Sequence, residues 1–147
     1  MATSTLIQFL NAGQTADTMN RRQVETFIAN GAIAVGDWVQ LDNSKTDADR
    51  TLFVKEAAAT ADGNALVIGV ATEAAAAGDQ VRVVVSGYAE GASVDNAVNA
   101  AGLALVVDNT AAGKANAIAA SDKAPACGVS LEAASGHLCD VWVFKRF

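Results

Sequence analysis

The sequence predicts a small, mainly β domain of the sandwich or barrel-like type. Three observations carry this prediction: short runs of β-branched residues between turn residues, an internal repeat, and a length that suits one domain. A chain of 147 residues buries roughly two-thirds of its unfolded surface, so it needs no disulfide or metal to stay folded. Much of the 52% hydrophobic content is alanine, and the core must therefore come from Val, Leu, Ile and Phe.

The most informative feature is the internal repeat. Residues 69–78 read Gly-Val-Ala-Thr-Glu-Ala-Ala-Ala-Ala-Gly, and residues 128–136 read Gly-Val-Ser-Leu-Glu-Ala-Ala-Ser-Gly. A short apolar strand follows each segment, at 81–85 and at 139–144. Because the glutamate and alanine run between the strands is very short, we expect it to form a loop rather than a helix.

The correspondence continues upstream, where residues 36–44 match residues 102–110. In both segments a glycine opens a strand, and an Asp-Asn-hydroxyl turn closes it. Two matched blocks in the same order predict an internal duplication within a single β domain at 31–147, with related halves near 31–91 and 92–147. The alternative is chance alignment in an alanine-rich chain, since biased composition mimics repeats.

Residues 1–30 differ from the rest, and we expect an N-terminal arm followed by the first strand. The arm carries an apolar cluster, Leu6, Ile7, Phe9 and Leu10. A polar stretch follows at 11–22, and the first strand begins at 23–28. The cluster is either an apolar interaction element at the tip of the arm or a first strand packed on the protein's own core.

Composition and charge narrow the classes of partner. The formal net charge of −6 and the pI of about 4.5 give an acidic surface that repels phosphate backbones and anionic lipid headgroups, so we expect no nucleic-acid partner. No apolar run approaches the length of a membrane helix, and residues 1–5 lack the pattern of a secretory signal, so we expect no membrane partner. We expect Cys127 and Cys139 to be small buried hydrophobic residues rather than a disulfide.

The side chains that an enzyme would need are sparse. The single histidine, His137, lies in the run Ser-Gly-His-Leu-Cys-Asp at 135–140, and neighbours on one turn and strand cannot converge as a catalytic triad. The acidic stretch at 42–49 lacks the central glycine of a calcium loop, and Phe53 stands where the bidentate glutamate would fall. We therefore expect no enzyme activity, no cofactor and no metal site.

Strand alternation places both tryptophans on the polar phase of their strands. Trp38 shares its phase with Gln40, whereas Val39 lies on the other phase. In the last strand Trp142 and Phe144 share a phase. Because aromatic residues are enriched at binding surfaces, we predict that Trp38, Trp142 and Phe144 are interface residues, together with the apolar cluster of the arm. The alternative is a two-layer fold that covers both phases internally.

The stretch from about residue 21 to residue 91 resembles the head decoration proteins of tailed bacteriophages. These capsid cement proteins carry small β-tulip-like or β-sandwich domains, with a pattern of Gly-Asp-x-Val-x-Leu-Asp, then Gly-Val-Ala, then Ala-Gly-Asp-x-Val-x-Val. The pattern is met here by residues 36–42, 69–71 and 77–83. The second half of the chain resembles the family only through the internal repeat.

The resemblance implies a structural virion protein that binds the outer surface of a phage capsid and stabilises the lattice of the major capsid protein. It implies synthesis in the cytoplasm of the bacterial host and self-association, often as a homotrimer. It supplies no catalytic residue. The alternatives are a tail-tube or head–tail connector component, and a carbohydrate-binding β module in which Trp38 and Trp142 would contact the sugar.

Overall fold

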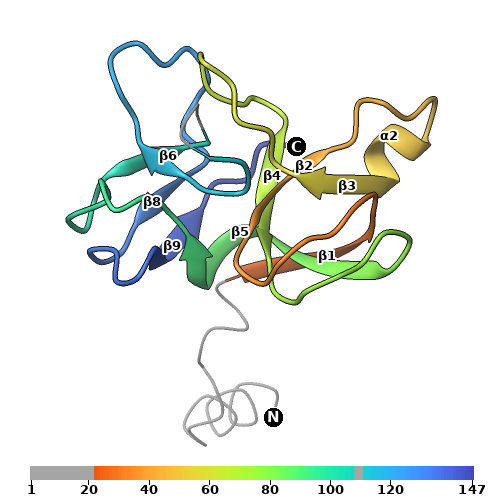
Figure 1. The fold of residues 1–147 in the computed structure, drawn as a ribbon, viewed down its shortest axis with the longest axis horizontal. Helices are drawn as coiled ribbons and strands as arrows, with labels where there is room; N and C mark the ends of the chain where they lie inside the picture. The colour runs from red at the N-terminus through yellow and green to blue at the C-terminus, as the bar shows by residue number, and fades with distance from the viewer. Residues whose placement is uncertain (1–21, 108–110) are drawn as a thin grey trace, which may run out of the picture.

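The computed structural model describes residues 22–107 and 111–147. The fold is mainly β, as predicted, and its 9 strands form one strongly curved sheet (Figure 1). The strands are β1 (Arg22–Ala29), β2 (Trp38–Leu41), β3 (Phe53–Glu56), β4 (Val67–Ala71), β5 (Gln80–Ser93), β6 (Ala104–Val106), β7 (Asn116–Ala117), β8 (Gly128–Ser130) and β9 (Leu138–Val143). Within the described residues the only helix is the single turn α2 (Asp49–Leu52). The predicted apolar cluster of the arm lies outside the described residues.

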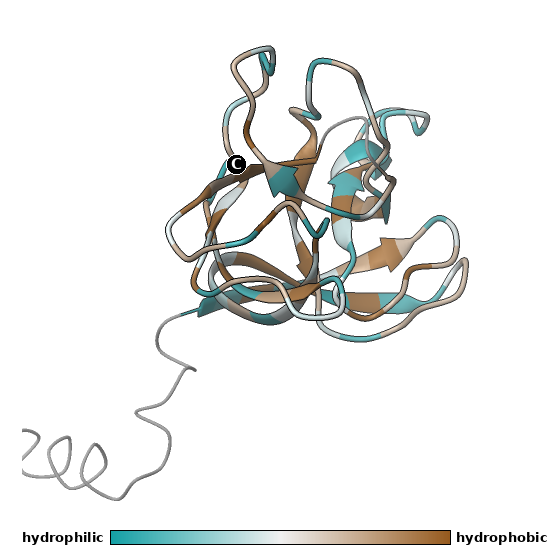
Figure 2. Ribbon diagram, turned by 60° about the vertical axis from the view of Figure 1, so that its left-hand side comes forward, coloured by the Kyte–Doolittle hydropathy of each residue, from teal (hydrophilic) through white to brown (hydrophobic). Residues whose placement is uncertain are grey.

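The first half of the sheet closes into a five-stranded barrel in the order β1-β3-β2-β4-β5. Closure depends on β1, which pairs parallel with β3 and antiparallel with β5. The interior is apolar, and Figure 2 shows apolar stretches along the strands. Its buried residues are Phe27, Ala29, Ile33, Val39, Val54, Ile68, Ala71, Ala75, Val81, Val83 and Val85.

The second half extends the sheet from β5 in the order β9-β8-β6-β7, and we call this curved unit the second barrel. An isolated parallel bridge pairs Val94, which follows β5, with Ala115, which precedes β7. Two backbone hydrogen bonds support this bridge: Ala115 N donates to Ser93 O over 3.0 Å, and Asp95 N donates to Ala115 O over 2.9 Å. The strand β5 therefore belongs to both barrels.

The shared strand contains two residue pairs that are typical of turns. Nevertheless β5 runs through Ser86-Gly87 and Glu90-Gly91 for 14 residues. Its pairing with β9 is irregular between Ala89 and Ala92. Gly87 and Gly91 have φ values of +91° and +61°, so the glycines redirect the strand from the first barrel to the second instead of ending it.

The two barrels use equivalent backbone hydrogen bonds at equivalent positions. Gly36 N donates to Ala71 O over 2.9 Å, and Gly102 N donates to Ser130 O over 2.7 Å. The φ values of Gly36 and Gly102 are +86° and +83°, a conformation that favours glycine. The two segments matched in the sequence therefore share their local structure.

The match extends to the hairpins β4–β5 and β8–β9. A Cβ atom on Gly69 would lie 2.0 Å from Val84 O, and a Cβ atom on Gly128 would lie 2.7 Å from Trp142 O. Both contacts are too close for any residue other than glycine without a backbone shift. Gly69 and Val84 are thus the counterparts of Gly128 and Trp142.

Strand order repeats as well. The order β3-β2-β4-β5 in the first barrel recurs as β7-β6-β8-β9 in the second. The strand β1 corresponds to the end of β5, because Ala29 pairs parallel with Val54 as Val94 pairs parallel with Ala115. By this matching Arg22, at the start of β1, corresponds to Gly87 of β5. The halves expected near 31–91 and 92–147 stay a prediction. A common origin of the halves remains a prediction.

Candidate interaction surface

The outward side of β9 carries exposed aromatic side chains. Its inward residues, all buried, are Cys139, Val141 and Val143. Trp142 is 37% exposed, and Phe144, which follows the strand, is 40% exposed. In the sheet register Trp142 lies between Tyr88 of β5 and Val129 of β8. We call the outward residues Ala104, Val129, Trp142 and Phe144 the β9 face.

Two hydrogen bonds to Asp140 connect β5 with β9 next to this face. Tyr88 Oη donates to Asp140 Oδ2 over 2.7 Å, and Gly91 N donates to Asp140 Oδ1 over 3.0 Å. The bond to Asp140, with burial and the surrounding negative charges, raises the pKa of Tyr88 to about 12. Tyr88 therefore stays a neutral donor at physiological pH, and it ties β5 to β9 beside Trp142.

Trp38 does not lie on this or any other surface, and its prediction as an exposed interface residue is wrong. Its side chain is fully buried, at 0% exposure. The reason is the second barrel, whose buried residues form one apolar cluster with Trp38, Val70 and Val84. Strand alternation gave the phase of Trp38 correctly, but both phases of β2 are covered internally. A sugar-binding groove that uses both tryptophans is therefore excluded.

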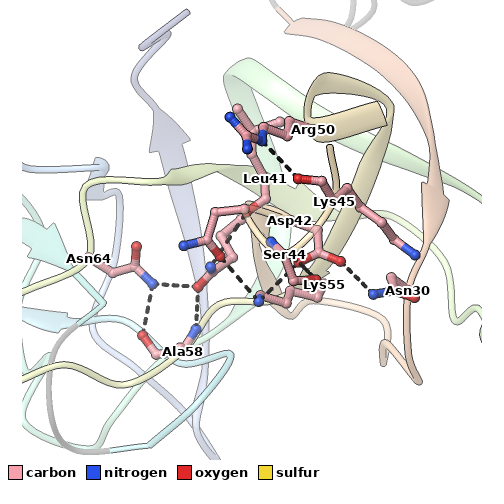
Figure 3. A network of polar contacts seen from close by, with 11 residues as sticks. Asn30, Leu41, Asp42, Ser44, Lys45, Arg50, Lys55, Ala58 and Asn64 are labelled. Atoms are coloured by element: carbon pink, nitrogen blue, oxygen red, sulfur yellow. Dashed lines mark hydrogen bonds and ion pairs between the residues drawn. The ribbon is translucent and has the colours of Figure 1, made fainter. Parts of the chain in front are cut away.

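The polar neighbours of Trp38 on β2 are buried for the same reason. Gln40 is 4% exposed, and its Oε1 accepts hydrogen bonds from Asn64 Nδ2 and from Ala58 N, each over 2.7 Å (Figure 3). Asn64 Nδ2 also donates to Ala58 O over 2.8 Å. These bonds satisfy the buried amides and fix the loop that follows β3.

Asp42 is the first residue of the acidic stretch at 42–49. Its carboxylate accepts from Ser44 N over 3.1 Å and from Ser44 Oγ over 2.7 Å, and it also accepts from Asn30 Nδ2 (Figure 3). Lys55 Nζ lies 3.1 Å from Asp42 Oδ1. Burial alone would raise the pKa of Asp42, but these bonds outweigh burial and hold the pKa well below its usual range. The carboxylate thus has a structural role.

The residues of the histidine run also have structural roles. His137 is an exposed turn residue with a φ of +65°, between Ser135 and Leu138, as predicted. Cys127 and Cys139 are buried and free. Burial raises the pKa of the Cys127 thiol to about 12 and raises the pKa of Cys139 as well. Among residues 22–107 and 111–147, no group of three or more His, Cys, Asp or Glu side chains is placed to hold a metal.

Two hollows were not anticipated from the sequence. An apolar cavity of about 240 Å³ opens at one end of the first barrel, with the strand residues Phe27, Leu41, Ile68 and Val85 on its walls and Phe147 at its rim. These residues come from four strands and the carboxyl-terminal segment, so only the barrel closure brings them together. An open groove of about 870 Å³ runs beside β1 and includes Arg22, the residue at which the amino-terminal segment joins the fold.

The described residues thus form a small β protein in which a closed five-stranded barrel continues into further strands that carry the partly exposed β9 face. No helix in the described part of the chain has the length and apolarity needed to cross a membrane. No protein-family model matches the chain, and no curated protein matches its sequence.

Solved structures do share the fold. The N base of the head fibre gp8.5 of bacteriophage phi29 matches with a TM-score of 0.51 and 16% identity, over 84% of this chain and 94% of that chain. A chain from the capsid of Myoviridae phage XM1 matches with a TM-score of 0.56 and 19% identity, over 87% of this chain and 84% of that chain. The resemblance to phage head proteins is thus confirmed at the level of the fold.

Proposed function

We propose that this protein is a structural component of a bacteriophage head, which binds the outer surface of the capsid and stabilises the lattice of the major capsid protein. The observation that carries the proposal is the fold shared with the phi29 head fibre base and the XM1 capsid chain, over 84% and 87% of this chain. Because one fold hosts many functions, the proposal also needs a surface suited to binding.

The β9 face supplies such a surface for self-association, which we propose gives a homotrimer. Trp142 and Phe144 are its candidate contact residues, since aromatic side chains bury a large area at a low cost in side-chain entropy. The bonds from Tyr88 and Gly91 to Asp140 hold the underlying strands in place before binding. A face that is ordered in advance loses less entropy on association.

The amino-terminal cluster supplies a second contact, which we propose is made with the capsid. Burying each of Leu6, Ile7, Phe9 and Leu10 would contribute roughly 1.5–3 kcal/mol. In a trimer these contacts would reinforce one another through effective concentration. The acidic net charge of −6 fits a surface that packs beside protein rather than beside packaged DNA.

Co-sedimentation with phage heads that lack this protein tests the proposal. We expect saturable binding of the purified protein to these heads, and a rise in the temperature at which the decorated heads release their DNA. Isolated tails serve as the control, because a tail-tube or connector subunit would bind there. Protein that remains in the supernatant with heads, or that sediments with tails instead, would overturn the proposed function.

A further inference from the structure

The two barrels differ at one pair of equivalent ends. In the first barrel the cavity of about 240 Å³ is lined by the strand residues Phe27, Leu41, Ile68 and Val85, and by Glu25, Thr51, Lys145, Arg146 and Phe147. The matching of the two halves makes Ala92, Val107, Cys127 and Val143 the counterparts of the four strand residues. These counterparts are at most 1% exposed and lie in one apolar cluster, whereas Phe27, Ile68 and Val85 are buried but 6–8% exposed. The same position therefore keeps a cavity in the first barrel and is fully covered in the second.

Trp38 belongs to the cluster that seals the second barrel. It extends from the outward side of the first barrel, and a Cβ atom on Gly128 would lie only 3.1 Å from Trp38 Cη2. Gly128 directly follows Cys127, one of the four sealed positions. The outer face of one barrel thus supplies the aromatic side chain that closes the interior of the next.

The β9 face is the counterpart of that outer face. Trp38 and Val70 pair across β2 and β4, as Ala104 and Val129 pair across β6 and β8. Val84 corresponds to Trp142, so each outer face carries one tryptophan. Trp38 is at 0% exposure, whereas Trp142 is 37% exposed. Among residues 22–107 and 111–147, each chain therefore presents one exposed tryptophan face and one barrel end with a cavity.

We propose that Trp142 of one copy of this chain inserts into the first-barrel cavity of a second copy, so that copies associate head to tail. The inference rests on the proposed self-association and names its two complementary surfaces. The cavity has room for an aromatic ring, since an engineered apolar cavity of about 150 Å³ accepts benzene. Head-to-tail contacts close into rings when the rotation between copies permits, and a trimer is such a ring.

Two complementary variants test the proposal by sedimentation velocity. Trp142→Ala removes the inserted side chain, and Leu41→Trp fills the cavity. We expect each variant alone to lose association by on the order of 30-fold, the loss typical of removing a central interface tryptophan. An equimolar mixture should form a 1:1 dimer and no larger species, because one intact cavity and one intact tryptophan remain. Val35→Ala, at a residue that is 62% exposed and belongs to neither surface, should behave as wild type.

Thr51→Trp provides a second way to block the cavity, because Thr51 lies at its rim on α2 and is exposed. It replaces Leu41→Trp if that change in the barrel wall lowers the melting temperature. Two results would overturn the proposal: a cavity-blocked variant that associates like wild type, or a mixture that stays monomeric. A wild-type chain that is monomeric at micromolar concentration would also overturn it.

The same variants, sedimented with phage heads, separate this proposal from the proposed function. Binding of monomeric protein to heads would leave the capsid role standing and remove the head-to-tail contact. Mixed dimers that do not bind heads would support the contact and remove the capsid role.

Discussion

At the scale of single residues, Asp42 illustrates how hydrogen bonds overcome the cost of burial. An unpaired buried carboxylate would be strongly unfavourable. Here Ser44, Asn30 and Lys55 all contact the carboxylate, and the net result is a pKa well below the usual range. The network ties the end of β2 to the residue after β1 and to β3. It therefore stabilises the wall of the first barrel.

We expect Asp42→Asn to lower the free energy of unfolding by about 1–3 kcal/mol at neutral pH, the range for losing hydrogen bonds to a charged group. Because the folded-state pKa is depressed, the wild-type advantage is complete above the unfolded-state pKa of about 3.9 and is lost as the pH falls through and below it. Urea denaturation of both proteins between pH 7 and pH 2 measures this difference. A difference that stays constant down to pH 2 would contradict the assigned role.

The two tryptophans show what residue patterns predict and what they do not. Alternation along a strand gives the phase of a side chain, and for Trp142 and Phe144 it correctly predicted exposure. The same reasoning failed for Trp38, because local periodicity carries no information about which distant element covers a phase. The cavity at the first barrel escaped prediction for a similar reason, since its walls come from strands far apart in sequence.

At the scale of elements, β5 decides how the halves are joined. The pairs Ser86-Gly87 and Glu90-Gly91 are typical of turns. Here their glycines allow one strand of 14 residues to bend from one barrel into the other. The repeat, the hairpins β4–β5 and β8–β9 and the loop between β4 and β5 were all predictable, because glycine and β-branched residues mark them locally. The continuity of β5 was not, since it depends on pairing with both β1 and β9.

The start of β1 determines how many amino-terminal residues can be deleted without removing a described strand. Among the described residues its pairing with β5 begins at Arg22, so a deletion of residues 1–12 removes none of the described strand pairs. We expect the truncated protein to keep its melting temperature within a few degrees and to lose occupancy on phage heads. Calorimetry and co-sedimentation measure the two quantities. If the deletion instead unfolds the domain, the cluster of Leu6, Ile7, Phe9 and Leu10 belongs to the core.

At the scale of the whole molecule, we expect the barrels to form one folding unit, because one apolar cluster contains residues of both. Trp38 is buried among residues of the second barrel, and Arg146 links the two halves by donating to Asn64 O over 3.2 Å and to Pro125 O. Neither barrel alone could bury Trp38, Val70 and Val84. Cooperative unfolding in a single transition is the physical consequence.

We expect Trp38→Ala to destabilise both barrels together, by about 3–5 kcal/mol, the usual cost of removing a buried tryptophan. The remaining tryptophan, Trp142, reports on the second barrel by fluorescence, whereas circular dichroism reports on strands of both. The two signals should give one coincident transition in urea. Separate midpoints would show that the barrels unfold independently. Val35→Ala, a change at an exposed residue, serves as the control.

The fold shared with phage head proteins supports our proposal that this chain decorates the outside of a capsid. Electron cryomicroscopy of heads assembled with and without the protein tests it most directly. We expect additional density on the outer capsid surface, into which the structure of residues 22–107 and 111–147 fits. Density confined to the tail or the connector, or heads that are identical with and without the protein, would contradict it.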